Sequence, residues 1–305
     1  MVQDFFIKSY SRTADRNITG IISFLYKAYR FVLRVLAQCI LPVVFHFKKR
    51  KYVVTGGDKI IVSLTSFPAR INKLWLVLES LLRQEVKADR IIVWLSKDQF
   101  SNFGELPTKL QSYQERGVLF RFEQGDLRSY KKFYYAFSEF SDSCVITVDD
   151  DILYDSSMIK ELVESYMKAQ GKRVIARFGT IVTKNSAGQL EKYVNWSPIV
   201  NVLQKEDYFF GSGGGTLFKP SDLYKDVCNK ELFLTLCPLA DDVWLNAMCR
   251  LGEVEIIMCN NIAVFPVNSK NNISLSAQNV YEDFNDKQIE LVNEYYRKEL
   301  NKIVF

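Results

Sequence analysis

The chain has 305 residues, which is enough for one large domain or two small ones with a sizeable buried core. Hydrophobic residues make up 48% and aromatic residues 14%, so low-complexity, fibrous and wholly disordered classes are excluded. Residues 1–51 hold ten of the 40 Lys and Arg residues but only two of the 35 Asp and Glu residues. The net charge of +5 is therefore a property of the N-terminus, and a basic body that binds nucleic acid is not indicated.

The first predicted element is an amphipathic helix over residues 18–37. Lys27, Arg30 and Arg34 share one face of it, and most other positions are apolar. The longest uncharged run, 35–47, would form a helix of about 20 Å, shorter than the roughly 30 Å hydrocarbon core of a bilayer. The pattern favours a helix on an anionic membrane surface over a spanning helix or a cleavable signal peptide. Packing on the body, or on a second subunit in a homodimer, is the alternative.

Six cysteines and one histidine, His46, argue against a zinc site, because no two cysteines have CxxC spacing. Cys144 and Cys259 lie in apolar runs, which predicts buried, reduced thiols in a reducing compartment.

The body alternates between strand and helix patterns. Its first half has predicted strands at 59–67, 90–96, 118–123 and 143–151, with helices at 72–84, 106–117 and 129–140. Its second half has predicted helices at 156–169, 241–250 and 286–303, strands at 173–178 and 254–258, a Gly-rich stretch at 211–215 and a mobile polar loop at 268–286. This order predicts an α/β fold with a mostly parallel sheet flanked by helices.

Ligands of such sheets bind at the carboxyl ends of the strands, which here are 65–70, 96–98 and 149–151. The last of these, in VITVDDDILY, is the most informative, because three adjacent carboxylates repel one another. Oxygen ligands suit Mg²⁺ or Mn²⁺, and the spacing of Asp149 and Asp151 places both on one side of an extended chain. The alternative is a solvated acidic turn.

Five segments, in order, resemble GT-A fold glycosyltransferases of the family 2 type. They are VSLTSFPARI, GDLRSYKKFYYAF, VITVDDD, FFGSGGGTLF and CPLADDVWL, and the resemblance covers residues 58–267. More narrowly, the sequence is similar to bacterial enzymes that build capsular or lipopolysaccharide glycans. The charge pattern predicts a basic membrane-associating or dimerising arm (1–55), the resemblance implies a GT-A catalytic domain (56–285), and the periodicity predicts a C-terminal helix (286–305).

The resemblance also implies a nucleotide diphosphate sugar as donor, with a UDP-sugar favoured. Asp151 would be the direct ligand of Mn²⁺ or Mg²⁺, Asp149 would contact the nucleotide and the metal, and Asp150 would share the sugar or metal shell. Many metal-dependent relatives add a late His ligand, which this body lacks. Either carboxylates, diphosphate and water complete the shell, or the metal is weakly held.

Other residues of the resembling segments are candidates for nucleotide-sugar binding. Ser66 and Arg70 follow the first strand and would hold base or phosphate, unless they form an ordinary loop. Asp126, Arg128 and Lys132 lie where the family approaches the nucleotide, and cations there would bind diphosphate. Their alternative is a solvated, capped helix start.

The stretch 211–215 reads G-x-G-G-G and is followed by a strand pattern, so it is not a dinucleotide fingerprint. Gly213 and Gly214 would let the backbone approach a sugar, or would form a bulge or a tight turn. Asp241 and Asp242 begin a helix, where carboxylates can act as caps. By resemblance Asp242 is instead the general base, with Asp241 as the reserve.

These expectations describe an inverting glycosyltransferase acting on a glycan or lipid-linked acceptor, with no nucleic-acid partner. The enzyme would be cytoplasmic and peripheral on the inner face of the cell membrane. Two alternatives are a nucleotidyltransferase on the same kind of sheet and an inactive, membrane-associated interaction module. The first usually needs a basic Gly-rich loop after strand one, and 65–70 has no glycine.

Overall fold

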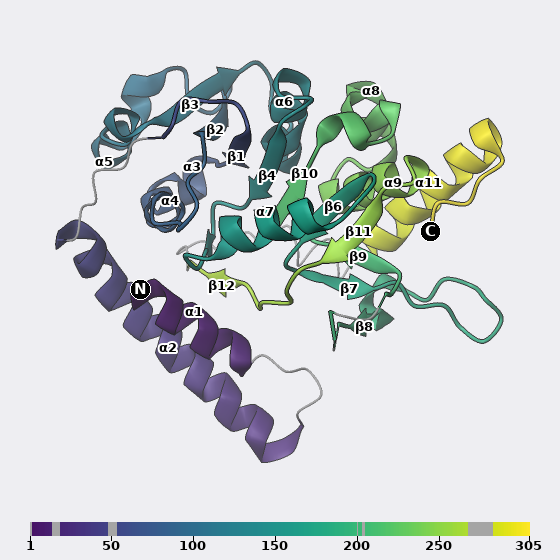
Figure 1. Ribbon diagram of the computed structural model, residues 1–305, viewed down its shortest axis with the longest axis horizontal. Helices are drawn as coiled ribbons and strands as arrows, with labels where there is room; N and C mark the ends of the chain where they lie inside the picture. Colours follow the sequence, from purple (N-terminus) through teal and green to yellow (C-terminus); the bar gives the residue numbers. More distant parts are fainter. Residues whose placement is uncertain (1, 14–18, 48–53, 200, 203–204, 268–282) are drawn as a thin grey trace.

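The structure is a computed structural model that describes residues 2–13, 19–47, 54–199, 201–202, 205–267 and 283–305. A helical hairpin at the N-terminus extends away from a body in which helices cover a central sheet (Figure 1). Of the predicted polar loop, residues 268–282 lie outside the described residues, as does the basic cluster 48–51.

The central sheet has seven strands in the order β11-β6-β10-β4-β1-β2-β3. Their bounds are β1 Ile60–Thr65, β2 Arg90–Ser96, β3 Val118–Glu123, β4 Cys144–Val148, β6 Arg173–Ala176, β10 Gly214–Phe218 and β11 Glu255–Met258. All neighbouring strands pair parallel except β10, which is antiparallel to both β4 and β6. The predicted α/β class, with a mostly parallel sheet flanked by helices, is confirmed.

Alternating apolar side chains of the strands supply two cores, one on each face of the sheet. Ile61 packs in the core that includes residues of α6 (Lys131–Glu139), α8 (Lys230–Leu236), α9 (Asp241–Leu251) and α11 (Phe284–Leu300). Val62, the next residue, packs in the core that includes residues of α4 (Leu74–Leu82) and α7 (Met158–Lys168). Two small sheets complete the body: β7 (Gly179–Ile181), β8 (Ser197–Pro198) and β9 (Tyr208–Phe210), and β5 (Ile152–Leu153) with β12 (Phe265–Pro266).

The predicted helix over 106–117 is wrong in extent. The chain forms only α5 (Thr108–Gln111) and a 3₁₀ turn at Gln114–Arg116, which ends at Gly117 with φ of 85°. Leu110 and Tyr113 are buried, but the neighbouring residues are polar, so a longer helix has too little apolar surface to stabilise it. The other predicted body helices are present within a few residues of their expected bounds.

The N-terminal hairpin consists of α1 (Val2–Arg12) and α2 (Gly20–Phe47). The predicted end of this helix at residue 37 was wrong. α2 continues through Pro42 and has 28 residues, which corresponds to a length of about 42 Å. Within the described chain it is the one helix long and apolar enough to cross a membrane, by length and composition.

One stripe of α2, however, is buried in the protein at Leu33, Ala37, Leu41 and Phe45, with the Arg83 guanidinium 4.7 Å from the Phe45 ring centre. The alternative that this helix packs on the body is therefore realised along that stripe.

All six cysteines are free thiols, as predicted, but Cys144 and Cys259 are half-buried and not fully buried as expected. Cys237 and Cys249 are buried, whereas Cys39 is exposed on α2. Two tryptophans of the second half are core residues. Trp196 and Trp244 are buried, and their indole N–H groups donate to the carbonyls of Glu191 and Val227, at 2.9 and 3.0 Å.

Candidate active site

The acidic triplet lies in a turn that follows β4, so the expectation of an extended chain through Asp151 was wrong. The turn separates the three carboxylates. The side chains of Asp149 and Asp151 are 37% and 33% exposed, whereas that of Asp150 is 6% exposed. Two carboxylates are thus available to a ligand, and the middle one is directed into the protein.

Ser66 and Arg70 hold the buried middle carboxylate. The Ser66 hydroxyl donates to Asp150 Oδ2 at 2.5 Å, and Arg70 lies 2.9 Å from Asp150 Oδ1 and 2.8 Å from Asp151 Oδ2. Arg70 comes from the short helix α3 (Pro68–Ile71), directly after β1. In this arrangement both residues brace the acidic turn, rather than presenting a phosphate site of their own.

Lys132 joins the acidic turn to α9. Its ammonium lies 2.7 Å from Asp149 Oδ1 and 3.0 Å from Asp241 Oδ2, and its side chain is 3% exposed. Burial opposes the charge, but Asp149 and Asp241 outweigh it and raise the pKa of Lys132 above its usual value. Lys132 is therefore a buried, permanently charged bridge between two carboxylates.

Asp241 and Asp242 begin α9, but neither serves as its N-cap, which is Ala240 and has no side-chain cap. Ser212 holds both carboxylates instead. Its hydroxyl lies 2.5 Å from Asp242 Oδ1 and 3.0 Å from Asp241 Oδ2, and its backbone N–H donates to Asp242 Oδ1 at 2.8 Å.

Burial, followed by the charge of Asp241, raises the pKa of Asp242 to about 6. Both bonds from Ser212 reach Oδ1, and a Cβ built on Gly211 would meet Oδ2 at 3.8 Å. One oxygen of Asp242 is therefore tethered, whereas no hydrogen bond among the described residues reaches the other.

The Gly-rich stretch lies against the acidic turn because β10 runs antiparallel to β4. A Cβ on Gly213 would lie 1.8 Å from Asp149 Oδ2, and one on Gly214 would lie 2.5 Å from the Cβ of Phe178. In the structure, Gly213 lies against the Asp149 carboxylate and Gly214 lies against the Phe178 side chain. The Asp149 carboxylate can occupy its position only because residue 213 has no side chain.

Asp126 and Arg128 form a separate group after β3. Asp126 accepts from Gln99 Nε2 at 2.8 Å and from the Arg128 backbone N–H at 2.9 Å, and it pairs with Lys131. Arg128 is exposed, with φ of 51°. Within the described residues no hydrogen bond or ion pair joins this group to the acidic turn.

Sequence reasoning missed two residues of the site. Ser212 carried a signal, as the one polar side chain within the Gly-rich stretch. Tyr154 carried none, because its role depends on a contact with residues far along the chain. Its buried hydroxyl accepts from the Asp149 N–H at 2.8 Å and donates to the Gly213 carbonyl at 2.6 Å.

The donor set fits a hard divalent cation of the kind that carries diphosphate. Among the described residues no three Asp, Glu, His or Cys side chains converge as a complete cage. Mg²⁺ and Mn²⁺ need fewer, because they bind one or two carboxylates and take other ligands from phosphate and water. Burial and the Asp149 charge raise the pKa of Asp151 to about 6, which marks uncompensated negative charge. Asp149 and Asp151 are the residues that would hold such an ion.

No protein-family model matches the chain, and no curated protein sequence matches it. Among solved structures, it is similar to a mannosyltransferase from Pyrobaculum calidifontis in complex with GDP-Man and Mn²⁺, with 12% identity, 89% of this chain and 75% of that chain covered, and a TM-score of 0.48. It is also similar to a fragment of TarS from S. aureus in complex with UDP, with 12% identity, 80% and 72% covered, and a TM-score of 0.44.

A third similar structure is a 4-diphosphocytidyl-2C-methyl-D-erythritol synthase from Anaerococcus prevotii, with 12% identity, 75% of this chain and 97% of that chain covered, and a TM-score of 0.43. Sequence identities and TM-scores this low do not indicate which reaction a protein catalyses. The function proposed for this chain therefore rests on the residues of its site.

Lys132→Met is expected to lower the free energy of unfolding by about 3–5 kcal/mol, because it leaves Asp149 and Asp241 without their shared cation. Urea denaturation followed by circular dichroism measures the change. Lys97→Met, which removes an exposed cation from the same body, is the control and should alter stability by less than about 0.5 kcal/mol. Equal stability of the two variants would mean that the bridge does not hold the site together.

Proposed function

We propose that this chain is a glycosyltransferase that moves a sugar from a nucleotide diphosphate sugar to a hydroxyl of a glycan or lipid-linked acceptor. The observation that supports this most directly is the bridge of Lys132 between Asp149 and Asp241. It places two sets of carboxylates in one site: a partly exposed set on the acidic turn and a tethered pair at the start of α9.

Each set suits one half of the transfer. Asp149 and Asp151 would hold Mn²⁺ or Mg²⁺, which, when bound, stabilises the charge of the departing diphosphate. Asp242 Oδ2 would accept the proton of the acceptor hydroxyl as its oxygen bonds to the anomeric carbon and the bond to diphosphate breaks. The raised pKa of Asp242 suits a base that must gain a proton near neutral pH. Direct displacement of this kind inverts the anomeric centre.

The other chemistry considered for this sheet, nucleotidyl transfer, has less support in the site. It would use a Gly-rich phosphate loop after β1, but 65–71 is a glycine-free segment that ends in α3. Its Ser66 and Arg70 are already engaged with Asp150 and Asp151. An inactive interaction module would have no need for a buried, charge-balanced pair such as Lys132 and Asp241.

A panel of nucleotide sugars with Mn²⁺ tests the proposal, with release of nucleoside diphosphate as the readout. We expect release from at least one UDP- or GDP-sugar, and Asp151→Asn should lower it at least 100-fold, because the metal loses a charged ligand. Pyrophosphate release from a nucleoside triphosphate would instead identify a nucleotidyltransferase. Full activity of Asp151→Asn would rule out the proposed metal site.

Asp242→Asn should retain donor binding but lose transfer, because an amide cannot accept the proton. Calorimetric titration of the donor and a turnover assay separate the two effects. In the unmodified protein, kcat should fall as the pH drops through about 6, since protonated Asp242 no longer acts as a base. Loss of donor binding in Asp242→Asn would show that this residue is not simply the base.

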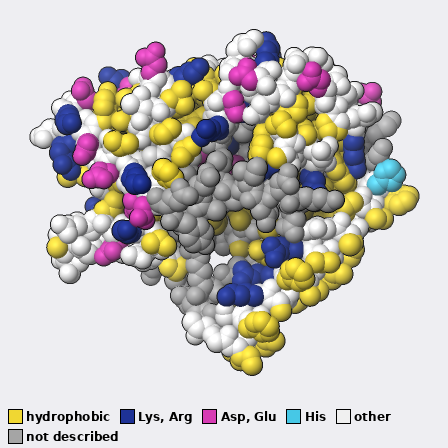
Figure 2. All heavy atoms as spheres, turned by 180° about the vertical axis from the view of Figure 1, so that it is seen from behind, with side chains coloured by type: hydrophobic (Ala, Val, Ile, Leu, Met, Phe, Trp, Pro, Cys, Tyr) yellow, Lys and Arg dark blue, Asp and Glu magenta, His cyan; other side chains and the backbone are white. Residues whose placement is uncertain are grey.

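We propose that the outer face of α2 lies on an anionic bilayer. It exposes Ile21, Phe24, Leu25, Phe31 and Val35, and the helix contains no Asp or Glu. Figure 2 shows hydrophobic side chains gathered along the hairpin, with Lys and Arg side chains beside them. Because the opposite stripe packs on the body, the helix fits a surface-bound position better than a spanning one. The proposal includes the expected location, peripheral on the inner face of the cell membrane.

Flotation with phosphatidylglycerol vesicles tests this placement. The full chain should float with the vesicles, and a Phe24→Asp/Phe31→Asp variant should remain in the dense fraction, because two charges would enter the hydrocarbon. Val194→Asp, at an exposed apolar position of the body, is the control and should still float. The placement would be contradicted if the Phe24→Asp/Phe31→Asp variant floated as much as the unmodified chain. It would also be contradicted if the unmodified chain dimerised through α2 and did not float.

A further inference from the structure

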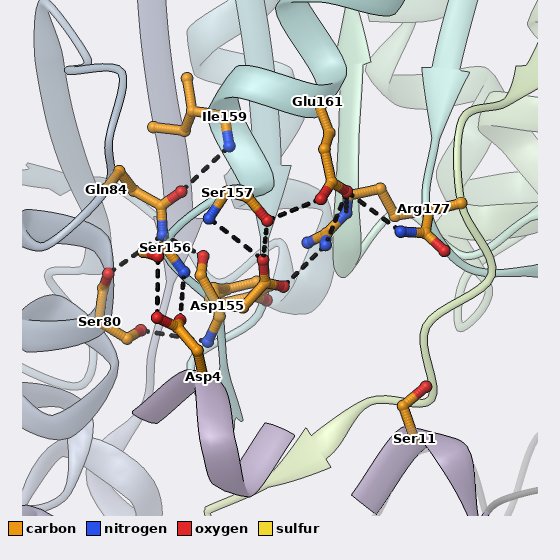
Figure 3. A network of polar contacts seen from close by, with 12 residues as sticks. Asp4, Ser11, Ser80, Gln84, Asp155, Ser156, Ser157, Ile159, Glu161 and Arg177 are labelled. Carbon is orange, nitrogen blue, oxygen red and sulfur yellow. Dashed lines mark hydrogen bonds and ion pairs between the residues drawn. The ribbon is translucent and has the colours of Figure 1, made fainter. Parts of the chain in front are cut away.

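The first turn of α1 is hydrogen-bonded to the segment that follows the acidic turn. Gln3 Nε2 donates to the Tyr154 carbonyl at 3.0 Å, and the two Asp4 oxygens accept from the Ser156 N–H at 2.7 Å and from its hydroxyl at 3.0 Å. Figure 3 shows Asp4 directed from α1 toward Ser156. Gln3 is 1% exposed, so these are interior contacts with directional geometry and not only apolar packing.

Tyr154 connects this helix to both halves of the site. Its carbonyl receives the bond from Gln3, while its hydroxyl is bonded to the Asp149 N–H and the Gly213 carbonyl. Asp149 carries one of the exposed carboxylates. Gly213 follows Ser212, which tethers Asp242. A displacement of Tyr154 would therefore move the acidic turn and the tether of the base together.

The segment around Tyr154 is also anchored without α1. Gln84 Nε2 donates to the Asp155 carbonyl at 2.6 Å, and Arg177 lies 2.7 Å from Asp155 Oδ2 (Figure 3). Arg177 and other favourable contacts outweigh the burial and lower the pKa of Asp155 below its usual value. Loss of the α1 contacts would consequently leave the fold intact and remove one of the bonds that hold the Tyr154 backbone, whose N–H also donates to Ser80 Oγ at 3.3 Å.

We propose that α1 is a positioning element of the transfer site, acting through Gln3 on Tyr154 and through Asp4 on Ser156, and thereby on Asp149 and Gly213. The inference rests on the proposed glycosyl transfer. Because α1 packs along α2, it also connects the helix proposed to lie on the bilayer to the carboxylates that perform the chemistry. Transfer from the sugar donor would then be fastest when α1 contacts the segment after the acidic turn as it does in this structure.

The test uses the full chain with a Gln3→Ala/Asp4→Asn double substitution and Ser11→Ala as the matched control. Ser11 anchors the other end of α1, where its hydroxyl accepts from the Ala263 N–H at 3.0 Å. Both variants should lower the melting temperature slightly. Only the double variant should lower kcat, by about tenfold, since small misplacements of reacting groups are costly. A Gln3→Ala single variant, which removes the bond to the Tyr154 carbonyl, serves if the double variant does not fold.

Amide hydrogen exchange, measured without donor, gives a readout that does not depend on catalysis. The Asp149 amide should exchange at least tenfold faster in the double variant, while amides of β1 should be unchanged. Equal exchange and equal kcat in the double variant and in Ser11→Ala would overturn the inference. If the unmodified chain releases no nucleoside diphosphate from any donor, the proposed function fails, and the exchange rates still decide the role of α1.

Discussion

A single buried ammonium sets the arrangement of this site. Lys132 lies between Asp149 on the acidic turn and Asp241 at the start of α9, and the buried charges of Lys132 and Asp241 stabilise each other in the interior. The bridge therefore fixes α6, the end of β4 and the start of α9 relative to one another. It also leaves the site short of positive charge, since five carboxylates meet only Lys132 and Arg70 among the described residues. A divalent cation accompanied by diphosphate is the ligand that suits such an imbalance.

The sheet topology explains why these groups meet. Because β10 runs antiparallel to β4, the turn that begins β10 lies where β4 ends. The Thr147 hydroxyl donates to the Ser212 carbonyl at 2.7 Å, which fixes that turn against the strand. The Ser212 hydroxyl donates to Asp242, and the Asp149 carboxylate occupies the space that a side chain at Gly213 would fill. One antiparallel strand in a mostly parallel sheet thus brings Asp242 and the carboxylates of the acidic turn together.

Helices and strands that depend on local periodicity were predicted from the sequence. Contacts between residues far apart in the chain were not. Alternating apolar residues in β1 and the VITV run of β4 were sufficient to place the sheet and the acids at its edge. The contact of Lys132 with Asp241 joins residues more than a hundred positions apart, and nothing local specifies it. The contacts of Ser66 and Arg70 with Asp150 and Asp151 likewise join distant residues, and the sequence did not predict them. The length of α2 was underestimated because charged residues were counted as breaks, although the helix simply carries them on its surface.

The most direct measurement is anomalous diffraction from crystals grown with Mn²⁺ and uridine or guanosine diphosphate. The account predicts a manganese peak bonded to Asp151 and Asp149 and to the diphosphate oxygens, with Lys132 still paired to Asp241. A diphosphate bound elsewhere, or a turn that holds no manganese and keeps Arg70 on Asp151 as here, would contradict it.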